Sequence, residues 1–230
     1  MSAESKPDLN AVWATLQSAP AHDIERLWAQ YEPDIGPAML GRIDRYYLLV
    51  RLMGRQDALH TWIYERCRMV EREPDGCLDL WARLHYKSSL ITVAGSIQEI
   101  ICDPELTIGI FSHTKSWARE RVAQIKRELE SNRYLQAIYP DVLYSDPSAQ
   151  APRWSVDAGL ICKRKGNPQE ATISGWGLVD GMPTGAHFGL MIFDDIVTET
   201  SVATPDQVAK TTEAWGLADN LGSFGTGTGD

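Results

Sequence analysis

The chain has 230 residues, which is enough for one sizeable α/β core together with a small helical subdomain. Its 22 basic and 31 acidic residues give a net charge of −9, which argues against a dedicated nucleic-acid-binding domain with a broad basic face. We expect a cytosolic protein, because no apolar run approaches the ~20 residues of a membrane-spanning helix, the first residues lack a signal pattern, and the widely spaced cysteines form no zinc or disulfide motif.

Residues 1–74 are predicted to form a helical N-terminal or lid region. Apolar side chains recur at helical spacing in several stretches, and Asp8 is placed to cap the first helix. Pro20, Pro33 and the Gly36-Pro37 pair separate the stretches. The aromatic residues on these stripes predict packing in a helical core.

The periodicity changes after Gly76, and residues 75–222 are predicted to form an α/β core. Short apolar runs alternate with helix-like stretches, which is typical of a mostly parallel sheet flanked by helices. The predicted elements are a strand over 77–82, a loop over 83–87, a helix over 88–101, a strand over 107–112, a helix over 115–130, a hairpin within 154–174, a strand over 188–193 and a helix from 204 to about 217. The Gly-rich tail over 223–230 is predicted to be flexible.

The first candidate site is the pair Lys87-Ser88. An apolar run, a turn, this pair and a helix follow one another in the order that a nucleotide-phosphate site needs. Lys87 is placed to reach the β- and γ-phosphates, and the Ser88 hydroxyl is placed to bind Mg²⁺. The glycines of the usual loop are missing, and because Tyr86 does not readily adopt the positive φ of a glycine, we expect a differently shaped loop. The alternative is that Lys87 is a solvated lysine at the start of a helix.

The second candidate site is the acidic pair Asp194-Asp195. The pair follows the apolar run 188–193, which is typical of a buried parallel strand and matches the Mg²⁺-holding strand of P-loop ATPases. Asp194 is the predicted metal ligand together with Ser88, and Asp195 is the predicted base that orients the attacking water. The alternative is that the pair caps a helix.

These motifs, in this order, resemble the N-terminal ATPase domain of the large terminase subunit of tailed bacteriophages. The resemblance covers roughly residues 75–222. It rests on the loop over 82–88, the segments 108–118, 132–135 and 139–141, the turn Thr184-Gly185-Ala186-His187, the acidic pair, and Trp215 with residues 219–222. It implies a P-loop NTPase fold of the ASCE or RecA-like class, with Walker A and Walker B motifs and with ATP and Mg²⁺ as cofactors. The residues that it implies for nucleotide binding are Arg83, Leu84, His85, Tyr86, Lys87, Ser88 and Ser89.

The resemblance also implies catalytic roles. Asp195 and the loop lysine are expected to be catalytic, and Arg83 is expected to act as an arginine finger in its own subunit. Two alternatives are open for Arg83. It pairs with a carboxylate such as Asp79, or the finger is Arg119 or Arg121 of a neighbouring subunit, although these last two are expected to be solvated helix residues.

The implied function is ATP hydrolysis that drives double-stranded DNA into a viral procapsid in the host cell cytoplasm. The implied partners are the double-stranded DNA, the portal protein, the small terminase subunit and further copies of the chain in a ring on the portal. The helical region is then a lid that frames the adenine.

Two departures from the family bear on this function. Asp195 stands where many terminases have a glutamate, and the chain has no room for the family's nuclease domain, so we expect an ATPase fragment whose Gly-rich tail begins a coupling segment. The alternatives are a helicase-like DNA-translocating ATPase and a nucleotide-binding assembly module without efficient turnover.

Overall fold

The computed structural model describes residues 7–74, 76, 78–82 and 85–222. The chain forms two compact units, one of residues Met1–Gln98 with Ala137–Tyr139 and the other of residues Glu99–Gln136 with Pro140–Asp230. The first unit therefore extends beyond residue 74, the predicted end of the helical region. Over the described residues, no helix combines the length and the apolar character needed to cross a membrane.

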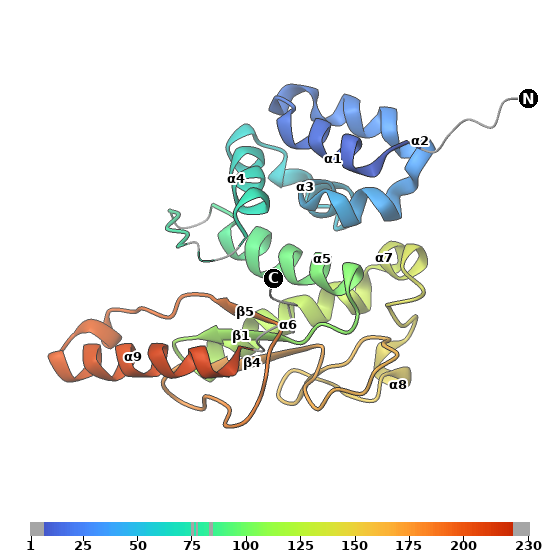
Figure 1. The fold of residues 1–230 in the computed structure, drawn as a ribbon. Helices are drawn as coiled ribbons and strands as arrows, with labels where there is room; N and C mark the ends of the chain where they lie inside the picture. The colour runs from blue at the N-terminus through green and yellow to red at the C-terminus, as the bar shows by residue number, and fades with distance from the viewer. Residues whose placement is uncertain (1–6, 75, 77, 83–84, 223–230) are drawn as a thin grey trace, which may run out of the picture. The chain divides into compact units, whose positions relative to one another are not determined.

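The first unit is built from helices (Figure 1). They are α1 (Leu9–Ser18), α2 (Ile24–Ile43), α3 (Arg45–Tyr47), α4 (Thr61–Arg72) and the start of α5 (Gly95–Cys102), with 3₁₀ turns at Ala21–Asp23 and Gln56–Ala58 and π-helical segments at Leu48–Leu52 and Ser88–Ala94. α1 begins at the predicted cap, where the Asp8 carboxylate accepts a 3.0 Å hydrogen bond from the Asn10 amide. α2 is interrupted at Gly36, whose φ of 78° is not helical. The helical character predicted for this part of the chain is confirmed.

Aromatic side chains fill the core of the first unit, as their helical spacing predicts. Trp28, Tyr46, Tyr47 and Tyr64 are buried. The ring centroid of Trp28 lies 5.7 Å from that of Tyr46 and 5.3 Å from that of Tyr47. Edge-to-face and tilted contacts of this kind add to the free energy gained from burying the rings.

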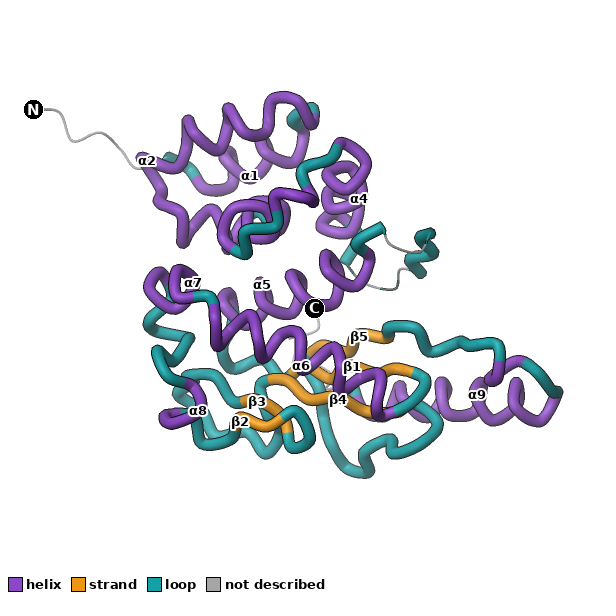
Figure 2. The backbone as a smooth tube through the Cα atoms, turned by 180° about the vertical axis from the view of Figure 1, so that it is seen from behind, coloured by secondary structure: helices purple, strands orange, loops and turns teal. Residues whose placement is uncertain are grey.

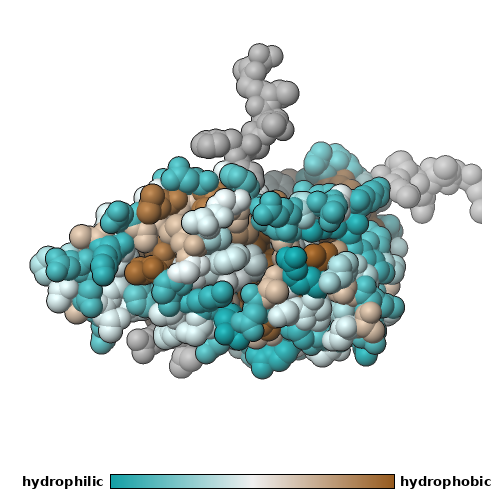
Figure 3. All heavy atoms as spheres, turned by 90° about the horizontal axis from the view of Figure 1, so that it is seen from below, coloured by the Kyte–Doolittle hydropathy of each residue, from teal (hydrophilic) through white to brown (hydrophobic). Residues whose placement is uncertain are grey.

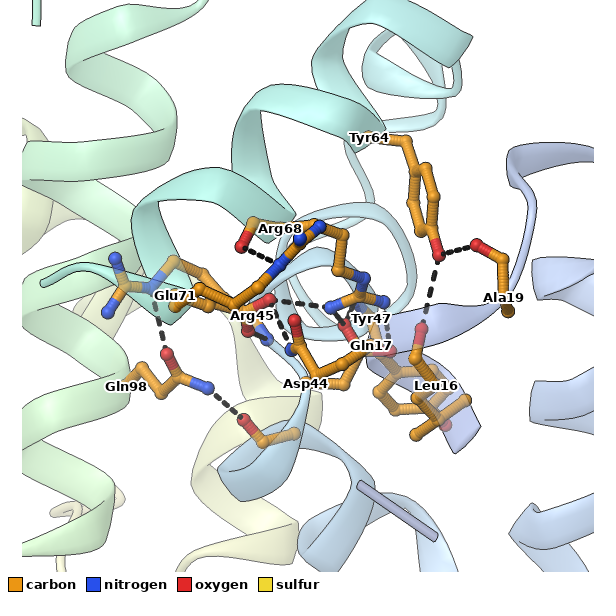
Figure 4. Close-up of polar contacts among 12 residues, drawn as sticks. Leu16, Gln17, Ala19, Asp44, Arg45, Tyr47, Tyr64, Arg68, Glu71 and Gln98 are labelled. Atoms are coloured by element: carbon orange, nitrogen blue, oxygen red, sulfur yellow. Dashed lines mark hydrogen bonds and ion pairs between the residues drawn. The ribbon is translucent and has the colours of Figure 1, made fainter. Parts of the chain in front are cut away.

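A buried carboxylate, Asp44, organises the polar centre of the first unit (Figure 4). It accepts hydrogen bonds from the Trp28 indole at 2.8 Å and from the Tyr47 amide at 3.0 Å, and it forms a 2.9 Å ion pair with Arg68. Arg68 also pairs with Glu71 at 2.6 Å. Burial alone would lower the pKa of the Arg68 guanidinium, but the two carboxylates outweigh burial and raise it. A buried charge is costly unless it is paired. Because the paired groups come from α2, α3 and α4, their pairing holds these helices together.

The second unit contains a five-stranded sheet in the order β2-β3-β4-β1-β5 (Figure 2). The strands are β1 (Ile108–Ser112), β2 (Trp154–Ser155), β3 (Gly159–Leu160), β4 (Ile173–Gly177) and β5 (Leu190–Phe193). β1 pairs in parallel with β4 and β5, whereas β2-β3 and β3-β4 are antiparallel. The expectation of a mostly parallel sheet is therefore wrong, because residues 154–160 add two short antiparallel strands and make the sheet mixed.

The two faces of the parallel part are covered differently. Helix α6 (Lys115–Ser131) packs against β1 and β4 through a stripe of buried residues: Ala118, Val122, Ile125 and Leu129. Gly175 of β4 permits this close approach, since a Cβ there would lie 3.0 Å from the Ala118 backbone. On the other face Phe111 contacts two further phenylalanines. Its ring centroid lies 5.8 Å from that of Phe188 and 5.1 Å from that of Phe193.

The remaining elements of the second unit are short or peripheral. They are α7 (Arg133–Ile138), α8 (Pro147–Gln150), α9 (Pro205–Ala218) and 3₁₀ turns at Thr200–Val202 and Asp219–Leu221, with α7 ending in the first unit. Trp215 of α9 packs on the Phe193 ring at 4.5 Å between centroids, while Val208 and Leu217 stay exposed. On the face drawn in Figure 3, hydrophobic residues form small groups separated by hydrophilic ones.

The predicted strand over 77–82 is wrong. Cys77 lies outside the described residues, and residues 78–82 form neither helix nor strand. Leu78 and Leu80 are 84% and 83% exposed. An apolar run forms a strand only where a neighbouring strand and a core are there to pair with it and bury it. Five other predicted elements are confirmed within two residues of their bounds: the helix over 88–101, the strand over 107–112, the helix over 115–130, the strand over 188–193 and the helix over 204–217. The hairpin predicted within 154–174 is confirmed in its antiparallel pairing, with Leu160 opposite Ile173.

Candidate functional site

Lys87 and Ser88 lie in the first unit, at the start of a helical run that continues through Ser88–Ala94 into α5. Lys87 is half-buried. The residue before it, Tyr86, has a φ of 65°, so the expectation that a tyrosine would avoid this conformation is wrong. The Tyr86 carbonyl accepts a 2.8 Å hydrogen bond from the Leu90 amide and begins the helix. The backbone thus enters the helix through a left-handed residue, although no glycine is present.

Two polar side chains hold Tyr86 in this conformation. The Tyr86 hydroxyl donates a hydrogen bond to Asp57, and the Arg55 guanidinium lies 5.2 Å from the centre of the Tyr86 ring. Arg55 also donates to Asp57 at 3.2 and 3.1 Å. These bonds from Arg55 and then from Tyr86 lower the pKa of Asp57 to about 2, and the Asp57 carboxylate in turn raises the pKa of the Tyr86 phenol. The contacts offset the cost of a left-handed tyrosine.

The rest of the predicted nucleotide loop is only partly described. Arg83 and Leu84 lie outside the described residues. The rings of His85 and Trp81 pack on Trp62, with centroids 5.1 and 5.3 Å away. Asp79 accepts a 3.1 Å hydrogen bond from the Trp81 indole, so the carboxylate considered as a partner for Arg83 also serves a neighbouring aromatic residue.

The acidic pair lies in the second unit, at the carboxyl end of β5. The Asp194 amide donates a 2.8 Å hydrogen bond to the Phe111 carbonyl, which continues the parallel ladder by one residue. Because side chains alternate along a strand, Asp194 shares the face of Ile192, which is the face that α6 covers. Asp194 is accordingly 3% exposed.

Helix α6 supplies a basic side chain to this pair. Arg121 Nε lies 2.9 Å from Oδ2 of Asp194, and Arg121 Nη2 lies 3.8 Å from Oδ2 of Asp195. The Arg121 side chain is 21% exposed, so the expectation of a solvated helix residue is wrong for Arg121. Arg119 points elsewhere and pairs at 2.9 Å with Asp157, where both side chains are largely exposed.

Asp195 has a different environment from its neighbour. Its side chain is 40% exposed, and its φ of 53° places the backbone in a left-handed turn directly after β5. Its carbonyl accepts a 3.3 Å hydrogen bond from the His113 amide at the end of β1. The next helical turn begins only at Thr200, so the alternative in which the pair caps a helix is wrong.

Sequence reasoning missed one residue near this end of the sheet, Asp180, and gave another, Arg121, a different role. Asp180 accepts a 3.1 Å hydrogen bond from the Lys115 amide and so caps α6. Thr114 occupies the cap position, but its hydroxyl shares a 2.9 Å hydrogen bond with the Ser116 hydroxyl and makes no capping bond to the helix backbone. Arg121 is the second. Its place three residues after the buried Ala118 was a usable signal, because residues three apart share a helix face.

Each of the two predicted metal ligands carries an oxygen of the kind that magnesium prefers. Ser88 and Asp194 offer hard oxygen ligands, the first in the first unit and the second in the second unit. Over the described residues, no group of three or more histidines, cysteines or carboxylates is arranged to hold a metal ion. Mg²⁺ in phosphate sites usually takes one or two protein ligands together with water and phosphate oxygens. Ser88 and Asp194 are each of the residue types that serve as one of these few protein ligands.

Comparisons of the chain with models of known families, with curated proteins and with solved structures yield no match. The functional argument therefore depends on the chemistry and geometry of the two candidate sites.

Proposed function

We propose that the chain is a Mg²⁺-dependent ATPase of the P-loop class. The observation that carries this proposal is the left-handed backbone of Tyr86 directly before Lys87 and Ser88. The main argument against a phosphate loop in the sequence was the absence of glycines. Tyr86 has the positive φ that a glycine would adopt before the lysine, which supports a phosphate-binding turn without glycines.

Each proposed residue has a role that follows from its chemistry. Lys87 neutralises charge on the β- and γ-phosphate oxygens, and Ser88 and Asp194 hold the magnesium ion. Bound Mg²⁺ contributes by neutralising charge that develops on the phosphate oxygens. Asp195, which is exposed enough to meet solvent, orients the attacking water. The role of Arg83 as an arginine finger stays a prediction, as does the binding role of Leu84.

We further propose that the ATPase serves a viral DNA-packaging motor of the terminase type. The support is the order of the motifs along residues 75–222, together with a parallel β1-β4-β5 core whose carboxyl edge carries the acidic pair. Ligands of open α/β sheets bind outside the carboxyl ends of the strands. Double-stranded DNA, the portal, a small terminase subunit and further copies of the chain are the proposed partners.

The proposal is tested by titrating the protein with a fluorescent ATP analogue and measuring steady-state ATP hydrolysis. Lys87→Ala should weaken nucleotide binding at least ~10-fold, since it removes the main positive charge at the phosphates. Lys210→Ala is the matched control, because Lys210 is an exposed lysine on α9, and it should behave as the wild type. Unchanged nucleotide affinity in Lys87→Ala would contradict the phosphate-loop assignment.

The two aspartates separate binding from turnover in the same assays. Asp194→Asn should weaken binding only when Mg²⁺ is present. Asp195→Asn should keep binding but slow hydrolysis by about 10²-fold, the usual contribution of a group that assists proton transfer. An intact nucleotide affinity with no hydrolysis in the wild type would favour the assembly module over the motor.

A further inference from the structure

Arg121 contacts both members of the acidic pair, and the proposed hydrolysis assigns it no role. Its guanidinium lies 2.9 Å from Asp194 and 3.8 Å from Asp195, measured between the nearest nitrogen and oxygen atoms. Asp194 is 3% exposed, so this is a partly buried pair and not a loose surface contact. One positive charge is therefore shared by two carboxylates.

The position of Arg121 is set by helix packing and not by a loop. Arg121 follows Ala118 by three residues, and the Ala118 backbone lies against Gly175 so closely that a Cβ on that glycine would approach it to 3.0 Å. Val122, the next residue, is fully buried against the sheet. The guanidinium is thus held beside the end of β5 by the same contacts that hold α6 on the sheet.

We propose that Arg121 controls metal entry at the acidic pair, by making divalent-cation binding depend on the nucleotide. The inference rests on the proposed function, because it takes Asp194 as the metal ligand. A divalent cation at Asp194 stands close to the guanidinium, and like charges repel strongly where little water separates them. The phosphates of a nucleotide bring the negative charge that offsets this repulsion. Without a nucleotide, Arg121 keeps the carboxylates neutralised and the metal out.

The test measures Mn²⁺ binding to the nucleotide-free full chain, using the electron paramagnetic resonance signal of free Mn²⁺. Arg121→Gln keeps an N–H donor for Asp194 but removes the charge, and it should bind Mn²⁺ at least ~10-fold more tightly than the wild type. Arg121→Lys keeps the positive charge that repels the cation and should stay within about twofold of the wild type. Arg119→Gln is the matched control, because Arg119 lies on the same helix and pairs with the exposed Asp157.

Each outcome of this test decides the inference. An unchanged Mn²⁺ affinity in Arg121→Gln overturns it, and so does an equal gain in Arg119→Gln, which would show an effect of net charge alone. Adding Asp194→Asn to Arg121→Gln must abolish the gain. If the gain is present but the wild type binds no ATP, the proposed ATPase function fails while the control of cation binding by Arg121 stands.

A measurement on the wild type covers the case in which Arg121→Gln does not fold. The Nε–H resonance of Arg121, assigned by its absence in Arg121→Lys, reports on the bond to Asp194. It should stay unchanged when Mg²⁺ alone is added to millimolar concentration. A shift of this resonance at low Mg²⁺ concentration without nucleotide would show that the guanidinium does not keep the metal out, and it would overturn the inference.

Discussion

At the scale of single residues, the molecule places unusual backbone geometry at both candidate sites. Tyr86 and Asp195 are the non-glycine residues with positive φ among those described, at 65° and 53°. Such residues are uncommon and persist where surrounding contacts hold them. One precedes the lysine proposed to bind phosphate, and the other follows the carboxylate proposed to hold the metal. The two strained positions thus coincide with the two motifs that sequence reasoning selected independently.

The strain at Tyr86 gives a prediction about stability. The left-handed backbone conformation costs a residue with a Cβ about 1–2 kcal/mol of free energy, whereas it costs glycine almost nothing. Tyr86→Gly and Tyr86→Ala both lose the contact with Asp57, so their difference isolates the backbone term. Tyr86→Gly should be more stable than Tyr86→Ala by about 1 kcal/mol in urea unfolding followed by circular dichroism. An alanine variant as stable as the glycine variant would refute a left-handed backbone at this position.

Tyr46 gives a prediction about alkaline pH. Burial raises the pKa of its phenol to about 12 from the ordinary 10. Between these values the unfolded chain loses the proton first, so the free energy of unfolding falls as pH rises from about 10 to about 12, by about 2–3 kcal/mol in all. Below pH 10 this contribution is fully present.

The measurement for Tyr46 is chemical denaturation over that pH range, with Tyr46→Phe as the control. Cys67, whose pKa is also raised by burial, contributes a slope of the same sign to both proteins. The difference between the two slopes therefore belongs to Tyr46. Parallel slopes in the wild type and in Tyr46→Phe would mean that Tyr46 is not buried as described.

At the scale of elements, the sequence pattern correctly predicted the helices and strands whose formation depends on their own periodicity. It failed for the segment whose formation depends on a distant pairing partner. The stripe on α6 and the apolar run of β5 carry their own periodicity, and both elements form close to their predicted bounds. Residues 78–82 also carry an apolar run but remain outside any sheet, with Leu78 exposed. An apolar run shows that a segment suits a strand, but it does not show that a neighbouring strand is there to pair with it.

The candidate sites follow the same rule. The lysine-serine pair and the acidic pair were found because their chemistry stands in consecutive residues. Arg121 was misjudged because its partner Asp194 is 73 residues away, a distance that helix periodicity does not bridge. The left-handed Tyr86 was misjudged because Asp57 and Arg55, which stabilise it, come from a different part of the first unit.

The buried network of the first unit gives a prediction at this scale. Replacing Arg68 by methionine leaves Asp44 as a buried carboxylate without its main charged partner, and such a change costs about 3–5 kcal/mol. Adding Asp44→Asn removes the stranded charge while keeping an acceptor for Trp28, so the double variant should recover about 2 kcal/mol over additivity. Arg51→Met is the control, since its pair with Glu25 is exposed and should cost less than ~1 kcal/mol. Additive costs in the double variant would show that Arg68 and Asp44 are not coupled.

At the scale of the whole molecule, the net negative charge limits how strongly this chain can bind DNA in the proposed packaging motor. The 31 acidic and 22 basic residues give a net charge of −9 and an isoelectric point near 5.1. Non-specific DNA binding depends on neutralising phosphates with lysine and arginine, and the number of contacts appears as the slope of affinity against salt. Several of the arginines in the described residues are already paired with carboxylates, among them Arg68, Arg119 and Arg121. In the proposed motor, the affinity for DNA should therefore depend more on the partner proteins than on this chain.

We accordingly expect the isolated chain to bind duplex DNA more weakly than about 10⁻⁴ M at about 150 mM salt, with a shallow salt dependence. ATP hydrolysis should be slow and should change little when duplex DNA is added, and the protein should be mainly monomeric in dilute solution. If the chain serves in a packaging motor as proposed, copies brought together on a portal would meet at high local concentration without intrinsic affinity. Fluorescence anisotropy of a labelled duplex over a salt series, light scattering and ATPase assays with and without DNA measure these expectations. Two results would contradict these expectations: tight DNA binding with a steep salt slope, or a stable free ring whose ATP hydrolysis is strongly stimulated by DNA. Either result would mean that local groups on this acidic chain bind DNA without partner proteins. The net charge would then not predict whether the chain binds DNA.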